Sequence, residues 1–205
     1  LDAENVTRFY GDAPPCGRCD PSQIWLPCDR AATRRWSPPA ARVSDVLLGG
    51  LVTSALFGTL VDTGIDRGDD DGADGWAKDF TVATESIAVT YALTVTVKHL
   101  IRRPRPLTYN PVVPRERRLR PNARLSFFSG HTSLAFAAAT SLGVTHWQRH
   151  EGALSRGLVL GLALGAAAAT GTLRVAAGEH FWSDVVVGAV AGALVGFAVP
   201  WLHQL

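Results

Sequence analysis

Two long stretches of this chain, residues 157–173 and 185–202, contain no charged side chain. Both are apolar on all sides, so each must be buried against protein or lipid along its whole surface. Further apolar runs at about 43–61, 80–101 and 129–147 end at polar or proline-rich segments. The 20 glycines, many of them inside these runs, favour close packing of helices. The pattern predicts an all-α fold, in which residues 43–205 form a bundle of five long apolar helices.

The lengths of these runs are compatible with two environments. They are near or below the about 17–25 residues that a helix needs to cross a bilayer, and soluble bundles also bury helices of this length. However, two runs without any charge are unusual for a soluble chain of 205 residues. We therefore expect an integral membrane protein whose bundle is embedded in lipid, and a soluble periplasmic protein is the alternative.

Residues 1–42 differ from the rest because they are rich in proline, arginine and aspartate and contain no apolar run that could span a membrane. Prolines at positions 14–15 and 38–39 interrupt regular structure, so we expect an irregular N-terminal arm with one short helix near 24–34. Its cysteines, Cys16, Cys19 and Cys28, are one ligand short of a tetrahedral zinc site. One disulfide plus a free thiol, formed in an oxidising compartment, is favoured, and three inert thiols are the alternative.

Residues 62–79 carry seven aspartates against two basic residues. A calcium loop with Gly72 at its sixth position would place Arg67 first and Lys78 twelfth, and neither side chain is a calcium ligand. We therefore predict a solvated turn between a first helix, for which Ser44 is a plausible N-cap, and a second. Glu85, inside the second apolar run, is expected to be paired or to lie at the membrane interface.

Three polar residues, Arg174, His180 and Asp184, lie between the two uncharged runs. An arginine offers a planar set of donors that suits a phosphate. His180 and Asp184 are four residues apart, so on a helix they share a face. A carboxylate in that position can hold one imidazole nitrogen protonated and leave the other free to attack. Taken alone, such a pair is often only a satisfied polar contact.

Two more groups of polar residues occur at the ends of apolar runs. Lys98 lies in the last turn of the second run, and Arg105 follows in a loop because the prolines on both sides of it end the helix. Both side chains can then converge on one anion. Ser129, Gly130 and His131 open the third run, where a helix N-terminus favours an anion. Ser129 can equally serve only as the helix cap.

In this order the three groups resemble the signature of the type 2 phosphatidic acid phosphatases, which are related to bacterial non-specific acid phosphatases and vanadium haloperoxidases. That signature reads Lys-x6-Arg-Pro, then Pro-Ser-Gly-His, then Ser-Arg-x5-His-x3-Asp. Phe128 replaces the usual proline and Leu173 the usual serine, and neither position carries the chemistry. The resemblance covers about residues 80–202, through Lys98-x6-Arg105-Pro106, Phe128-Ser129-Gly130-His131 and Leu173-Arg174-x5-His180-x3-Asp184.

The resemblance implies a metal-independent phosphatase that needs no cofactor and hydrolyses a phosphomonoester or diphosphate, most often of a lipid. His180, oriented by Asp184, would attack phosphorus to form a phosphohistidine, and His131 would protonate the leaving oxygen. The phosphoryl oxygens would be bound by Lys98, Arg105, Ser129, Gly130 and Arg174.

Two other functions fit parts of the pattern. A vanadate-dependent haloperoxidase would use the same anion site, although such enzymes are much longer chains. A non-catalytic lipid-phosphate-binding membrane protein would be expected to lack His180 or Asp184, and both are present. Residues 98–124 hold nine Lys or Arg against one Glu, but they lack interleaved aromatic residues and carry the phosphatase spacing. We therefore expect a phosphate ester and membrane lipid as partners, and no nucleic acid.

Alternation of the helices places the arm, the basic loop at 102–128 and the 174–184 stretch at one end of the bundle, with 62–79 and 148–156 at the other. The basic charges would favour a cytoplasmic catalytic end, but phosphate binding also accounts for them. The cysteines, and a start at Leu1 without methionine, favour an extracytoplasmic, periplasmic end. Membrane members of the family usually have six spans, so we expect the first to be absent or trimmed here. Four histidines have no motif partner and are expected to be structural or exposed: His99, His146, His150 and His203.

Overall fold

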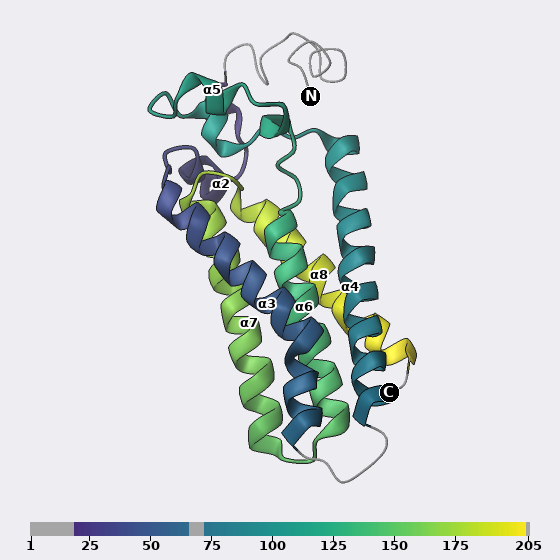
Figure 1. The fold of residues 1–205 in the computed structure, drawn as a ribbon. Helices are drawn as coiled ribbons and strands as arrows, with labels where there is room; N and C mark the ends of the chain where they lie inside the picture. Colours follow the sequence, from purple (N-terminus) through teal and green to yellow (C-terminus); the bar gives the residue numbers. More distant parts are fainter. Residues whose placement is uncertain (1–18, 66–71, 204–205) are drawn as a thin grey trace.

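The computed structural model describes residues 19–65 and 72–203, and this part of the chain contains helices and no strand. Five long helices lie side by side, and consecutive ones run in opposite directions (Figure 1). Two short α-helices and three 3-10 helices add to them. The predicted all-α bundle is therefore confirmed. The long helices are α3 (Pro38–Ile65), α4 (Gly72–Ile101), α6 (Gly130–Arg149), α7 (Ala153–Ala176) and α8 (Trp182–His203).

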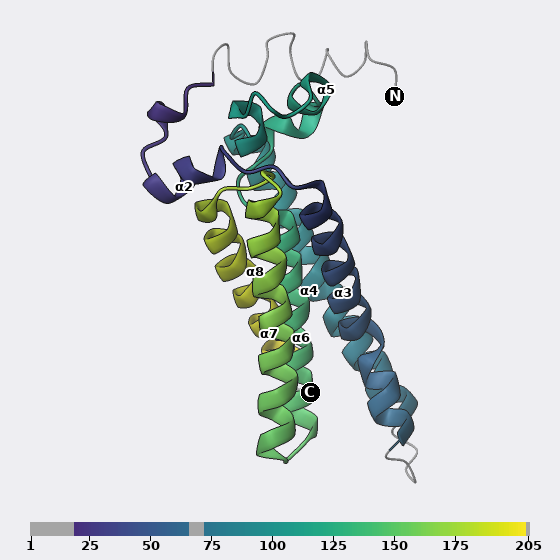
Figure 2. The ribbon, with the colours of Figure 1, turned by 90° about the vertical axis from the view of Figure 1, so that its left-hand side faces the viewer.

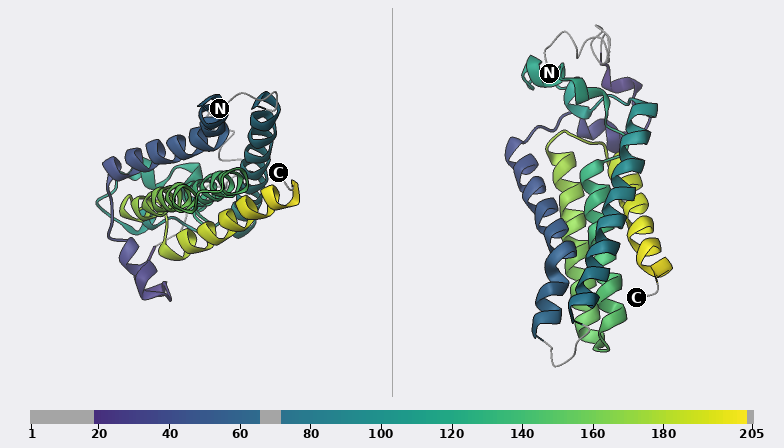
Figure 3. Two further views of the ribbon diagram at one scale, coloured as in Figure 1. Left: turned by 90° about the horizontal axis from the view of Figure 1, so that it is seen from below. Right: turned by 45° about the vertical axis from the view of Figure 1, so that its right-hand side comes forward.

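Helix α6 forms the centre of the bundle, because it contacts each of the other four long helices, as the end-on view in Figure 3 shows. Its small side chains allow these neighbours to approach closely. A run of three alanines, Ala137, Ala138 and Ala139, is completely buried. The central helix can therefore fix the positions of all the helix ends that surround it.

The contact between α6 and α8 is made backbone to backbone. Gly188, Gly192 and Gly196 form a row on α8, and a Cβ atom at these positions would lie only 2.8, 2.0 and 2.4 Å from a backbone oxygen of α6 or its N-cap. Such rows of small residues permit close helix packing without a polar interaction. The row holds the beginning of α8 against the beginning of α6, where the predicted site residues lie.

Four helices of the described chain are long and apolar enough to cross a membrane: Pro38–Gly58, Gly75–Tyr109, Ala153–Ala176 and Trp182–His203. Helix α6 is not among them, and it is also the helix that the others surround. Large apolar side chains on α7 and α8, including Leu158, Leu162, Val190 and Leu194, are exposed on the outside of the bundle. Lipid is the environment that would cover such a surface.

The first two helices extend beyond their predicted bounds. Helix α3 begins at Pro38, because proline is well tolerated in the first turn of a helix. The prediction that Ser44 is an N-cap is therefore wrong: Ser44 lies inside α3, and its Oγ donates to the carbonyl of Ala41. The solvated turn predicted at 62–79 is also too long, since α3 reaches Ile65 and α4 starts at Gly72. Residues 66–71 lie outside the described part.

Tertiary contacts stabilise the early start of α4. The indole N–H of Trp76 donates to the carbonyl of Leu56 at 3.3 Å. Asp79 is buried and accepts two hydrogen bonds of 2.6 Å from Arg149 at the end of α6. A buried carboxylate of this kind needs such a charged partner. Its interaction with a distant residue could not be recognised in a run of aspartates.

The third helix starts as predicted, because Ser129 is the N-cap of α6 and accepts a hydrogen bond from the Thr132 amide. The fourth helix is longer than the apolar run at 157–173 by about one turn at each end. Within the predicted loop at 102–128, three short helices form: η2 (Pro106–Tyr109), α5 (Arg115–Arg118) and η3 (Pro121–Arg124). Residues 102–128, called the basic segment below, are therefore ordered over the end of the bundle (Figure 2).

In the arm, η1 (Pro21–Gln23) and α2 (Pro27–Ala32) lie within or beside the predicted short helix at 24–34. Cys19 is disulfide-bonded and Cys28 has a free, exposed thiol, as the first of the two interpretations expects; Cys16 lies outside the described residues. The described arm, the basic segment and the 174–184 stretch lie at one end of the bundle, and the α6–α7 connection lies at the other (Figure 1). The predicted alternation is thus confirmed.

The polar residues without a motif partner have structural contacts. Glu85 pairs with His203 at 2.8 Å, in agreement with the prediction of a paired carboxylate. His146 lies 2.8 Å from Ser155 Oγ and stacks on His150 with 4.1 Å between ring centroids. His99 is exposed.

Candidate active site

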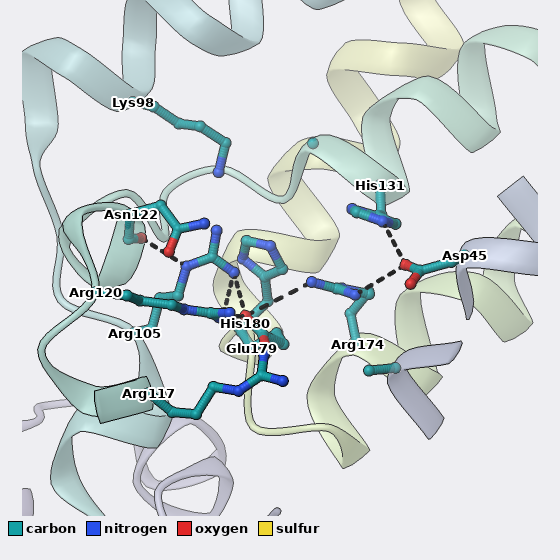
Figure 4. A pocket seen from close by; sticks show the side chains of 12 residues that line it. Asp45, Lys98, Arg105, Arg117, Arg120, Asn122, His131, Arg174, Glu179 and His180 are labelled. Atoms are coloured by element: carbon teal, nitrogen blue, oxygen red, sulfur yellow. Dashed lines mark hydrogen bonds and ion pairs between the residues drawn. The ribbon is translucent and has the colours of Figure 1, made fainter. Parts of the chain in front are cut away.

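A pocket of about 310 Å³ opens at the end of the bundle where the arm and the basic segment lie (Figure 4). It is lined by α3, the end of α4, the basic segment, the start of α6, the end of α7, and the stretch between α7 and α8. Most of the predicted site residues meet here. The lining consists of Ala41, Asp45, Lys98, Arg105, Arg117, Arg120, Asn122, Gly130, His131, Arg174, Glu179 and His180.

Two predicted site residues, Ser129 and Asp184, are completely buried and do not line the pocket. The Ser129 amide donates to the carbonyl of Asp184 at 3.0 Å, and its hydroxyl accepts from Thr132 Oγ1 at 2.8 Å. Ser129 thus joins the first residues of α6 to the first residues of α8. Its hydroxyl is engaged as a helix cap, which was the alternative interpretation.

The basic segment holds the Lys98 ammonium group in place. Lys98 is in the last turn of α4, and its Nζ donates to the carbonyls of Leu125 at 2.7 Å and Ser126 at 3.2 Å. An ammonium group has three N–H donors, so one remains for a ligand in the pocket.

Arg105 is held by contacts on one side of its guanidinium. Its Nε donates to the carbonyl of Asn122 at 2.9 Å, and Nη1 donates to Glu179 Oε2 at 2.5 Å. The remaining Nη2 has no partner within the described residues. Arg105 is the N-cap of η2 and is 8% exposed, so the short helix delivers a buried cation with a free donor edge.

Arg174 is held in a similar way at the end of α7. Its Nη1 donates to Ser44 Oγ at 3.3 Å and to Asp45 Oδ1 at 3.4 Å, both on α3. Its Nη2 lies 3.6 Å from Glu179 Oε2. Within the described chain, the buried Nε has no hydrogen-bond partner. Such an unsatisfied donor in a pocket wall indicates a place for an acceptor.

Glu179 is the carboxylate that these arginines share, and the sequence pattern did not single it out. It is buried and pairs with Arg105, Arg174 and also Arg120 of the basic segment. Burial raises the pKa of Glu179, but the three arginines outweigh this effect, and the pKa lies below its ordinary value. Its position directly before His180 was the available signal. The carboxylate holds two motif arginines from one side and leaves their other donors for a ligand.

His180 is 1% exposed, and its Nδ1 lies 3.6 Å from Asp184 Oδ2. The predicted pair is therefore within ion-pair distance but is longer than a hydrogen bond, and Nδ1 has no hydrogen-bond partner among the described residues. Burial, together with Arg105 and Lys98, lowers the pKa of His180 well below its ordinary value. The imidazole is therefore neutral, as a nucleophile must be.

Asp184 is held by a network that the sequence did not reveal. Its Oδ2 accepts from Ser126 Oγ at 2.5 Å and from the Phe181 amide at 2.9 Å. Its Oδ1 accepts from Arg103 Nη1 at 2.7 Å, and Arg103 Nη2 continues to Asp29 of α2 at 2.9 Å. The N-terminal arm is thus connected through Arg103 to the carboxylate behind His180.

Asp29 is completely buried and also accepts from the amide of Ser183 at 3.0 Å and from its hydroxyl at 2.5 Å. The Arg103 guanidinium lies over the Phe181 ring, 4.0 Å from its centroid. Three segments far apart in sequence, the arm, the loop after α4 and the start of α8, are therefore fixed together. This arrangement limits the movement of Asp184.

His131 lies across the pocket from Glu179 (Figure 4). Its Nε2 is 2.8 Å from Asp45 Oδ1, and Asp45, on α3, was not predicted as a site residue. Burial and the charge of Arg174 lower the pKa of His131 to about 4, although Asp45 partly opposes this shift. In the unliganded pocket the ring is therefore neutral near pH 7. Among the described residues, no three His, Cys, Asp or Glu side chains come together as metal ligands.

Comparison with known proteins places this geometry in a family. Residues 80–205, more than half of the chain, match the model of the PAP2 superfamily. The lipid A 1-phosphatase of Porphyromonas gingivalis is 37% identical over 90 residues, which are 43% of this chain and 19% of that protein. The chain therefore spans about a fifth of the length of this curated relative.

Two solved structures share the fold. Aquifex aeolicus LpxE has a TM-score of 0.54 and 24% sequence identity, over 83% of this chain and 90% of that one. The first transmembrane PAP2 type phosphatidylglycerolphosphate phosphatase from Bacillus subtilis has a TM-score of 0.56 and 24% identity, over 86% and 83%. With its four apolar helices, the chain is an integral membrane protein, and it belongs to the PAP2 superfamily.

Proposed function

We propose that the chain is a metal-independent phosphatase that hydrolyses a lipid phosphate through a phosphohistidine at His180. The observation that carries this proposal is the pocket itself. Lys98, Arg105 and Arg174 surround a neutral, buried His180 within one cavity. The fixed cations supply the positive charge that a transferred phosphoryl group requires.

Nδ1 of His180 faces Asp184, so Nε2 is the nitrogen available to attack phosphorus. In the first step, the Nε2 lone pair forms a bond to phosphorus while the bond to the leaving oxygen breaks. His131 donates its proton to that oxygen. In the second step, His131 accepts a proton from water, the water oxygen bonds to phosphorus, and the bond between phosphorus and His180 Nε2 breaks, which releases inorganic phosphate. His180 is then regenerated.

Substrate binding is part of the proton transfer. His131 is neutral in the empty pocket because burial and Arg174 lower its pKa. A phosphate dianion offsets the charge of the arginines, and a nearby negative charge favours the protonated imidazole. Binding therefore prepares His131 as the acid. Asp45, 2.8 Å away, stabilises the resulting imidazolium.

A lipid substrate fits the position of the pocket, which lies at the end of a bundle with an exposed apolar exterior. The relatives named above act on lipid A and phosphatidylglycerolphosphate. We propose a substrate of the same chemical class, a phosphate ester on a lipid anchored in the membrane.

An extracytoplasmic catalytic end is supported by the disulfide of Cys19, because disulfides persist in oxidising compartments. Cys28, free and exposed on α2 at the same end, provides a natural reporter. A membrane-impermeant maleimide should label Cys28 in spheroplasts, and a Cys28→Ser protein serves as the control. Labelling only after permeabilisation would place the catalytic end in the cytoplasm.

The activity is tested by phosphate release from a short-chain phosphatidic acid in detergent with excess EDTA. We expect release by the unmodified protein and none by His180→Ala. Quenching with alkaline SDS during turnover of a radiolabelled phosphate ester should trap label on the protein, stable in base and labile in acid. Release that requires added Mg²⁺, or that continues in His180→Ala, would contradict the proposal.

A further inference from the structure

The pocket contains more positive charge than the three motifs supply. Two of its arginines, Arg117 and Arg120, come from the basic segment, and neither is part of a motif (Figure 4). The lining holds five basic side chains against two carboxylates, so basic groups exceed acidic ones by three. A phosphate monoester offsets about two of these charges, and a diphosphate monoester carries about one more.

Arg120 has an unsatisfied donor in this wall. Its Nη2 pairs with Glu179, but its buried Nε has no hydrogen-bond partner among the residues that the structure describes. Buried N–H groups of this kind are rare unless a ligand or water completes them. Arg174 has the same feature at the motif site, so the wall holds one such donor in the motif site and a second beyond it.

The motif site and the part of the wall that holds Arg120 lie next to each other. Arg105 and Arg120 donate to the same oxygen, Glu179 Oε2, so their donor nitrogens are at most about 5–6 Å apart, twice a hydrogen-bond length. Adjacent phosphoryl groups of a diphosphate match this spacing. A second phosphate elsewhere on a large head group would lie further away.

Arg117 adds a cation without a carboxylate partner. It is exposed on α5, it lines the pocket, and its guanidinium points toward the region of Glu179 (Figure 4). No hydrogen bond or ion pair of its side chain occurs within the described ranges. A ligand that reaches Arg120 can therefore also be bound by Arg117 without breaking an existing contact.

We propose that Arg117 and Arg120 form a second phosphoryl subsite and that the preferred substrates are diphosphate monoesters of lipids. This rests on the proposed phosphatase function. The terminal phosphoryl group lies at His180, and the inner one lies on the two arginines. His180 forms the bond to the terminal phosphorus as the P–O–P bridge breaks, and the lipid monophosphate leaves with the bonding electrons as a dianion, which needs no proton from His131.

The test compares farnesyl diphosphate with farnesyl phosphate, which share one tail, in the same detergent. Arg117→Gln should lower kcat/KM for the diphosphate about 10- to 100-fold more than for the monophosphate, the range expected for a charge-assisted hydrogen bond. The matched control is Arg115→Gln, which removes the same charge from the same short helix at an exposed position outside the pocket. It should change neither rate by more than about twofold. Equal losses on both substrates, or none, would overturn the subsite.

A binding measurement separates this inference from the phosphatase proposal. By calorimetry, the unmodified protein should bind inorganic pyrophosphate at least about tenfold more tightly than phosphate. That ratio should fall to near one in Arg117→Gln and persist in Arg115→Gln. If neither farnesyl ester is hydrolysed, the phosphatase proposal fails, and this ratio still decides the subsite. An unchanged ratio in Arg117→Gln would overturn it.

Discussion

Arg103 donates a 2.7 Å hydrogen bond to Asp184, and this contact connects the carboxylate behind His180 to the N-terminal arm. The same guanidinium reaches Asp29 at 2.9 Å. Both carboxylates are completely buried, whereas Arg103 is partly exposed. Two buried negative charges therefore depend on one arginine, and this dependence is a consequence of the fold that the motifs alone do not indicate.

Replacing Arg103 with alanine should lower both stability and turnover. Removing one partner of a buried ion pair leaves an uncompensated charge, which costs about 3 kcal/mol. Asp184 would then take up a proton or move, and His180 would lose its orientation, so kcat should fall at least about tenfold. Thermal unfolding in detergent and phosphate release measure the two effects. The control is Arg102→Ala, next in sequence, whose exposed side chain bonds, among the described residues, only to the carbonyl of His99. Comparable losses in both proteins would show that Arg103 has no special role.

Glu179→Gln keeps the shape of the side chain and removes its charge. Glu179 offsets part of the charge of Arg105, Arg120 and Arg174, so we expect inorganic phosphate to inhibit the variant about tenfold more strongly. Slower product release should lower kcat while KM also falls. Product-inhibition assays on both proteins provide the measurement. Weaker phosphate inhibition in Glu179→Gln would mean that the carboxylate aids binding only by positioning the arginines.

The helical bundle and most of the pocket could be predicted from sequence, because apolar runs and motif spacing are local properties. Lys98, Arg105 and Arg174 were identified because their spacing matches the family signature, and each lines the pocket. The partners of these residues were missed for a physical reason. Glu179 and Asp45 are single carboxylates whose role depends on which helix ends meet, and that is decided by tertiary packing. The early start of α3 was missed because Pro38 was interpreted as a helix breaker, although proline at the first helical position is favourable.

The glycine row of α8 allows a test of the packing that holds the beginning of α8 against the beginning of α6. A Cβ at Gly192 would lie 2.0 Å from the Ser133 carbonyl oxygen, so Gly192→Ala must push α8 away from α6. We expect a loss of about 1–3 kcal/mol in stability, as for other overpacked cores, and reduced activity. Gly161→Ala on α7 is the control, because nothing lies within 4 Å of its added Cβ, and alanine is the better helix former. Equal stability of the two variants would contradict the close contact.

Phosphate should change the ionisation of His131. In the empty pocket, burial and Arg174 lower its pKa to about 4, so the ring is neutral above that pH. A bound dianion should raise the pKa, and kcat should then decrease as pH rises through the raised value because the acid loses its proton. NMR titration of ¹⁵N-labelled histidine, with and without phosphate and with His131→Asn for assignment, measures both values. An unchanged pKa on phosphate binding would remove the proposed route by which the substrate prepares its own acid.

The two histidines should differ in how their loss depends on the leaving group. An alkyl or lipid alkoxide leaves poorly without a proton, and general acid assistance is typically worth about 10²–10⁴-fold. A p-nitrophenolate leaves readily without one. His131→Ala should therefore be severely impaired on a lipid phosphate and retain much of its rate on p-nitrophenyl phosphate. His180→Ala should lose both activities, because no leaving group replaces a missing nucleophile.

Both proteins would be checked for folding and assayed on both substrates at saturating concentrations. The control is His99→Ala, because His99 is an exposed histidine outside the pocket. Equal fractional losses for His131→Ala on the two substrates would mean that His131 is not the acid, and another proton donor would have to be found for the lipid alkoxide.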